Sequence, residues 1–106
     1  LTLLNDETML EMARALARRL ITEGGGTPQD RLNYGFRLCL TRRPTEAELA
    51  RMVALYQQQL VNYQLDPVAA RKLVSVDSPE LAVSELAALT VVSNVLLNLD
   101  EMVTKQ

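Results

Sequence analysis

The residues of this chain that could do chemistry are few and scattered. Its 106 residues contain no histidine and a single cysteine, Cys39. The lack of histidine removes the commonest general base, the commonest zinc ligand and every histidine-dependent triad. A lone cysteine without a histidine or CxxC partner is a poor nucleophile, and its place between Leu38 and Leu40 predicts a buried, inert thiol. We therefore expect no enzymatic activity, no metal site and no cofactor site in these residues.

Paired carboxylates are the remaining candidates for acid–base catalysis. They occur at positions 6–7, 46–48 and 100–101. Carboxylates in the first turn of a helix complement its positive end and bind its free N–H groups, so capping explains the first two pairs. The third pair lies near the end of an apolar segment, where its charge opposes the helix dipole. We expect that pair to bind an arginine of another helix.

Two further patterns could indicate ligand binding. The glycines at 24–26 follow no predicted strand and precede no P-loop lysine, so they predict a helix stop rather than a phosphate loop. The segments on either side of residues 41–44 resemble a helix-turn-helix that would present Arg51, Gln57 and Gln58 to a DNA groove. Two glutamates at the start of the second segment and a net charge of −2 oppose that interpretation. Two packed helices joined by a proline turn, without a nucleic-acid partner, are favoured.

Helix start and stop signals divide the chain clearly. Asn5 can cap a helix to about residue 21, with apolar residues on one stripe and Glu11, Arg14 and Arg18 away from it. Thr27 followed by proline begins a second helix, which ends at the Arg-Arg-Pro of residues 42–44. Gly35 within it predicts close approach by a neighbouring helix, since glycine costs about 1 kcal/mol relative to alanine there.

The second half of the chain predicts three more helices. Thr45 and Glu48 form a capping box before the third, a short fourth spans about 67–73, and the last runs from about 79 to 103. Between residues 81 and 99 this last helix carries only one charge, Glu85. That segment is long enough and apolar enough to be tested as a membrane span. Its six polar residues favour a core position instead. We predict a single all-α domain over residues 1–106, an irregular bundle of about five helices around a hydrophobic C-terminal helix.

Three segments together support a family resemblance. They read LLND at 3–6, FRLCLTRRPTEAEL at 36–49 and LLNLDE at 96–101. The set resembles the C-terminal helical domain of the large planctomycete-type exported proteins of unknown function, which often carry an upstream cytochrome-c-like domain. Met102 and Leu89 stand where that family usually has phenylalanine and tryptophan. The resemblance implies an exported or periplasmic protein associated with c-type haem through another domain, and it brings no established activity.

The leading hypothesis is a non-catalytic accessory or scaffolding domain. The chain begins without methionine, so we expect it to be part of a longer protein whose other domains are its partners, without membrane insertion of its own. An alternative is a contribution to an enzyme or c-type-haem electron-transfer assembly completed by upstream domains. The polar residues expected to join the chain's entrance, the proline turn and the last helix are Asn5, Arg42, Arg43, Asn98, Asp100 and Glu101.

Overall fold

In the part of the chain that its structure describes, the regular secondary structure of the molecule is entirely α-helical. The computed structural model describes residues 7–75 and 80–104, with side chains over 7–75 and 83–100. The helices in order are α1 (Glu7–Glu23), α2 (Pro28–Leu40), α3 (Glu46–Leu65), α4 (Pro67–Val74) and α5 (Glu80–Thr104). The prediction of an irregular five-helix bundle is confirmed.

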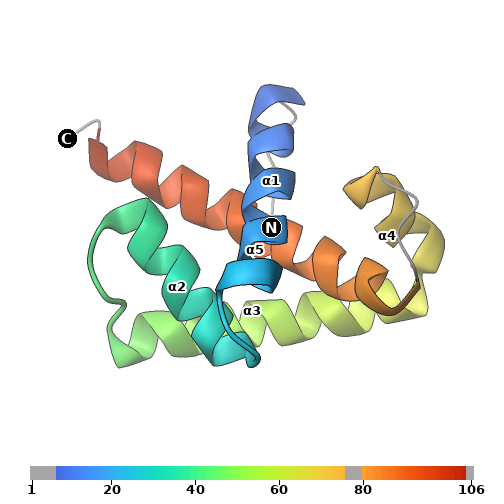
Figure 1. Cartoon of the computed structure of the whole chain (residues 1–106), viewed down its shortest axis with the longest axis horizontal. Coiled ribbons are helices and arrows are strands. Elements are labelled where there is room, and N and C mark those ends of the chain that lie inside the picture. The colour runs from blue at the N-terminus through green and yellow to red at the C-terminus, as the bar shows by residue number, and fades with distance from the viewer. Residues whose placement is uncertain (1–6, 76–79, 105–106) are drawn as a thin grey trace.

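Helix α5 lies at the centre of the bundle, and each of the other four helices contacts it (Figure 1). Its middle is almost wholly buried, with Leu89, Val92 and Leu96 fully enclosed. The segment Val83–Asp100 is long and apolar enough to cross a membrane, yet 61% of it is buried against the other helices. A core position, as the sequence predicts, accounts for its apolar composition.

The capping signals of the sequence form in the structure. Thr27 Oγ1 accepts from the Asp30 N–H at 3.1 Å, and Thr45 and Glu48 make both hydrogen bonds of the capping box, at 3.1 and 2.8 Å. Gly25 ends α1 in the left-handed conformation, with φ of 98°. The proposed Asn5 cap and most of the predicted turn at 75–79 lie outside the described residues.

Gly35 lies in a close contact between α2 and its neighbours α1 and α5. A Cβ atom there would lie 3.0 Å from Leu20 Cδ2 and 3.2 Å from Leu96 Cδ1. Both leucines are fully buried, so α1 and α5 occupy the space that a larger side chain would need. This confirms the interpretation of Gly35 as a packing residue.

The expectation that Arg14 lies away from the buried face of α1 is wrong. Arg14 is only 7% exposed, its Nε donates to the Leu73 carbonyl at 2.7 Å, and it pairs with the carboxylate of Glu11. The carbonyl of Leu73 lies in the last turn of α4, where it has no acceptor role within its own helix. Arg14 supplies the missing donor and thereby joins α1 to α4.

Candidate functional site: an arginine-lined pocket at the end of α2

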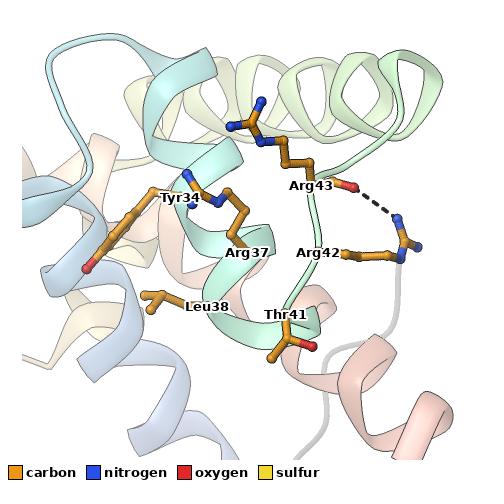
Figure 2. A pocket seen from close by; sticks show the side chains of 6 residues that line it. All are labelled: Tyr34, Arg37, Leu38, Thr41, Arg42 and Arg43. Carbon is orange, nitrogen blue, oxygen red and sulfur yellow. Dashed lines mark hydrogen bonds between the residues drawn. The ribbon is translucent and has the colours of Figure 1, made fainter.

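The pocket lies where α2 turns into α3 and measures about 500 Å³. Six residues line it: Tyr34, Arg37, Leu38, Thr41, Arg42 and Arg43 (Figure 2). The first four recur at helical spacing, so one face of α2 and its C-cap form one wall. The two residues after the cap complete the pocket.

Thr41 directs the chain out of α2. It adopts the left-handed conformation with φ of 55°, which costs a non-glycine residue roughly 1 kcal/mol. Its N–H donates to the Arg37 carbonyl at 2.9 Å, and its hydroxyl donates to the Leu40 carbonyl at 2.7 Å. The turn therefore brings Arg42 and Arg43 to the same pocket as the α2 face.

Arg42 anchors this turn. Its two terminal nitrogens donate to the two carboxylate oxygens of Glu48 at 2.9 and 3.0 Å, and its guanidinium carbon lies 4.9 Å from the ring centroid of buried Phe36. Nη1 also donates to the Arg43 carbonyl at 3.2 Å (Figure 2). These contacts join the turn to α3 and to the aromatic ring of α2.

Glu48 is held ionised by the same contacts. The hydrogen bonds from Arg42, and then from the Thr45 N–H of the capping box, lower the pKa of Glu48 from 4.5 to about 2. The pairing with Glu48 raises the pKa of Arg42. One carboxylate therefore both caps α3 and fixes the arginine that positions the turn.

Arg37 and Arg43 differ from Arg42 in having no such partners. Both are exposed, and among the described residues neither guanidinium makes a hydrogen bond or an ion pair. Figure 2 shows the Arg42 guanidinium directed away from the other two. Within the part of the chain that the structure describes, the pocket thus presents two unpaired cations.

Tyr34 forms the opposite edge of the pocket and links it to α1. Its hydroxyl donates to Glu23 Oε1 at 2.5 Å, and the same carboxylate oxygen lies 3.1 Å from Arg19. The hydrogen bond to Glu23 raises the pKa of Tyr34, while Arg19 and then Tyr34 lower the pKa of Glu23. Glu23 is engaged in this triad.

A second hollow of about 360 Å³ adjoins the first and shares Leu38 with it. Its other lining residues are Met12, Ala15, Leu16, Arg19, Cys39, Leu97 and Asp100. Met12 is 48% exposed and Leu38 is 38% exposed, so this hollow presents an apolar shelf beside the two cations.

The sequence predicted that Cys39 is buried, but Cys39 is half-buried and lines the second hollow. Burial, and then the negative charge of Asp100, raises the pKa of the Cys39 thiol from 9.0 to about 11. The thiol is therefore protonated at neutral pH. Cys39 packs against the edge of the core, next to the last residue of α2, which accounts for its partial exposure.

The structure places the sequence-predicted polar residues in different surroundings. Arg42 and Arg43 share the turn, while Asn98 Nδ2 donates to Asn94 Oδ1 one turn earlier on α5, at 3.1 Å. Asp100 is half-buried beside Cys39. Asn5 and the side chain of Glu101 lie outside the described residues. The predicted network joining the entrance, the turn and the last helix stays a prediction.

Sequence reasoning did not single out Arg37, although a signal was present. Tyr34, Arg37, Leu38 and Thr41 stand at positions i, i+3, i+4 and i+7 of one helix. That spacing defines one helical face, and it ends beside the Arg-Arg pair.

In the residues from 7 to 75 and 80 to 104, no group of three or more histidine, cysteine, aspartate or glutamate side chains could hold a metal ion.

Comparison with known families identifies the chain at family level. The model of the PSD1 family, described as a protein of unknown function (DUF1553), matches residues 1–56. The chain belongs to the PSD1 family. No curated protein matches it, and no solved structure matches it. The PSD1 match contains α1, α2 and the arginine-lined pocket, and it ends within α3 at Tyr56.

Proposed function

We propose that this PSD1 chain is a non-catalytic helical accessory domain that docks onto other parts of a longer parent protein. The observation that carries the proposal is the pair of unpaired cations, Arg37 and Arg43, beside the exposed apolar side chains of Met12 and Leu38. Docking surfaces typically combine arginine and methionine or aromatic contacts with a polar rim. We call these four residues the docking surface.

The resemblance to planctomycete-type exported proteins supports a more specific placement. It suggests a domain at the C-terminal end of its parent and a periplasmic or otherwise exported location. The segment that carries most of that resemblance, residues 36–49, contains the turn with Arg42 and the α3 capping box. The docking surface would then face the upstream domains.

Side-chain footprinting of the 106-residue chain, alone and within its full-length parent, tests the proposal. Peroxide oxidises exposed methionine, and phenylglyoxal modifies exposed arginine. In the parent we expect Met12, Arg37 and Arg43 to lose reactivity, while Arg51, which is exposed on α3, retains it. Equal reactivity of Met12 and Arg43 in both samples would refute docking through this surface.

A second candidate function is a contribution to an active site or c-type-haem electron-transfer site completed by another domain. One observation favours it: polar side chains from α2 and from the turn after it, among them Tyr34, Arg37 and Arg43, line the same pocket. The two functions differ in what the variant Arg43→Ala does in the parent protein. If Arg43→Ala slows haem reduction but Met12 and Arg37 stay protected, the shared site is favoured. If the variant loses the protection of Met12 and Arg37 but reduces haem at the same rate, docking is favoured.

A further inference from the structure

We infer that the arginine-lined pocket binds a carboxylate side chain of an acidic peptide segment, with an adjacent apolar side chain of that segment seated on Leu38. The inference rests on the proposed function and deepens it by naming the chemistry of the partner. It follows from what Arg37, Arg43 and their neighbours have left unpaired.

The guanidinium groups favour a carboxylate because of their geometry. A guanidinium donates two parallel N–H groups that match the two oxygens of a carboxylate. The same turn already contains one such pair, since Arg42 holds both oxygens of Glu48 at 2.9 and 3.0 Å. Arg37 and Arg43 offer the same donors in the same pocket without an acceptor among the described residues.

Three carboxylates beside residues that line the two hollows already interact with other groups. Glu48 is bound by Arg42, and Glu23 is bound by Arg19 and Tyr34. Asp100 lines the second hollow, where its charge acts on Cys39. A carboxylate that approaches from a partner therefore complements the positive charge of the pocket.

The apolar part of the site sets what must accompany the carboxylate. Leu38 lines both hollows, so the space beside the cations continues over its side chain towards Met12. A segment with an acidic residue next to a large apolar residue can place one side chain in each hollow. Inorganic phosphate can occupy only the charged part.

Nucleic acid fits this surface less well. Affinity for a nucleic-acid backbone grows with the number of phosphates neutralised, and this pocket offers two unpaired guanidiniums in a chain of net charge −2. One peptide carboxylate needs no more than these two guanidiniums, and we therefore favour a peptide partner.

Fluorescence anisotropy with a defined probe tests the inference. The probe is a short fluorescein-labelled peptide that alternates glutamate and leucine, and its counterpart replaces each glutamate with glutamine. We expect the glutamate peptide to bind the 106-residue chain, and Arg37→Ala and Arg43→Ala each to weaken binding about tenfold, as expected for loss of a charge-assisted hydrogen bond. Arg51→Ala, the matched exposed arginine outside the pocket, should leave binding unchanged. Circular dichroism confirms that each variant is folded.

Several outcomes would overturn the inference. These are equal binding of the glutamine peptide, no binding of either peptide, or the same loss of affinity in Arg51→Ala. Displacement of the peptide by inorganic phosphate at equimolar concentration would assign the pocket to small anions, and tighter binding of a duplex DNA would assign it to nucleic acid. A Leu38→Ser variant that retains full peptide affinity would contradict the apolar contact.

The footprinting experiment separates failure of this inference from failure of the proposed function. If Met12 and Arg43 are protected in the parent but the glutamate peptide does not bind, the domain docks through contacts other than a carboxylate. If neither residue is protected in the parent, the docking function itself is wrong, whatever the peptide does.

Discussion

The centre of α5 and the turn between α2 and α3 differ in burial and in charge. In the centre of α5, Leu89 and Leu96 are fully buried and surrounded by the other helices. At the turn, three arginines lie within seven residues, and of these only the Arg42 guanidinium has hydrogen-bond partners among the described residues. Packing against the other helices accounts for the apolar side chains of the first region, where buried Ser93 Oγ and Asn94 Nδ2 lack a hydrogen-bond partner among the described residues. In the second region, contacts within the described fold account for Arg42 and leave Arg37 and Arg43 unexplained.

This difference teaches where functional information is located in a chain without catalytic residues. A residue that the fold uses, such as Arg42 on Phe36 and Glu48, needs no partner outside the domain. An exposed cation that the fold does not use, such as Arg43, is a candidate for recognition. Two consecutive arginines thus have different surroundings, which their sequence positions alone do not distinguish.

The largest expected effect tests the packed region. Leu96→Ala removes a fully buried side chain from the contact of α5 with Gly35, and such a change typically costs about 3 kcal/mol of unfolding free energy. Leu65→Ala is the matched control because Leu65 is 81% exposed, and we expect a change below about 0.5 kcal/mol. Urea denaturation measures both. Similar losses in the two variants would contradict the position of α5 at the core.

A smaller effect is expected at the helix contact of Gly35. Gly35→Ala places a methyl group about 3 Å from Leu20 and Leu96. Overpacking costs roughly 1–3 kcal/mol and the better helix propensity of alanine returns about 1 kcal/mol, so we expect a net loss of about 1 kcal/mol. Gly26→Ala meets no atom within 4 Å and should be near neutral. A Gly35→Ala variant more stable than the unsubstituted 106-residue chain would show that α1 and α5 can move away from α2.

Acid sensitivity sharpens the contrast at the turn. The pKa of Glu48 is lowered in the folded state from 4.5 to about 2, so its contribution to stability is complete above about 4.5 and is lost as the pH falls towards 2. We expect the melting temperature of the unsubstituted 106-residue chain to fall more steeply through this window than that of Glu48→Gln. The variant Glu46→Gln changes an exposed position in the same turn of α3, and its melting temperature should change with pH as that of the unsubstituted chain does. Identical acid profiles for all three would remove the role of the Arg42–Glu48 pair.

The smallest effect concerns the thiol between the two regions. Because the pKa of Cys39 is raised to about 11, alkylation by iodoacetamide at pH 8 should be at least about tenfold slower than that of a free thiol. Asp100→Asn should accelerate the reaction by removing a charge that disfavours the thiolate. Asp66→Asn, which preserves the cap of α4, should leave the rate unchanged. Mass spectrometry follows the reaction, and an equal acceleration in both variants would show that Asp100 has no local effect.

The fold was predictable because its signals are local. Thr27, Thr45 and Gly25 mark helix ends through hydrogen bonds or dihedral angles that involve only a few consecutive residues. The apolar composition of α5, interrupted by six polar residues, predicted a core position rather than a membrane span. Arg14 was misassigned because its partner, the Leu73 carbonyl, lies 59 residues away along the chain.

The candidate site was only partly predictable. Arg42 and Arg43 stood out as a pair, but their different roles depend on contacts with Phe36 and Glu48 that side-chain directions decide. Arg37 was detectable from its helical spacing to Thr41. That the second hollow adjoins the pocket could not be predicted, because Met12 and Leu97 come from α1 and α5 and meet Leu38 only through tertiary packing.

The central position of α5 has a consequence for how the domain is made. Ribosomes synthesise the chain from its N-terminus, so α1 to α4 emerge before the helix that each of them contacts. Until the residues of α5 leave the exit tunnel, the core cluster that includes Leu20, Leu32 and Phe36 lacks all its members from α5. Folding of this domain is therefore expected to wait for the last quarter of the sequence, and a nascent chain stalled before Glu80 should remain sensitive to protease.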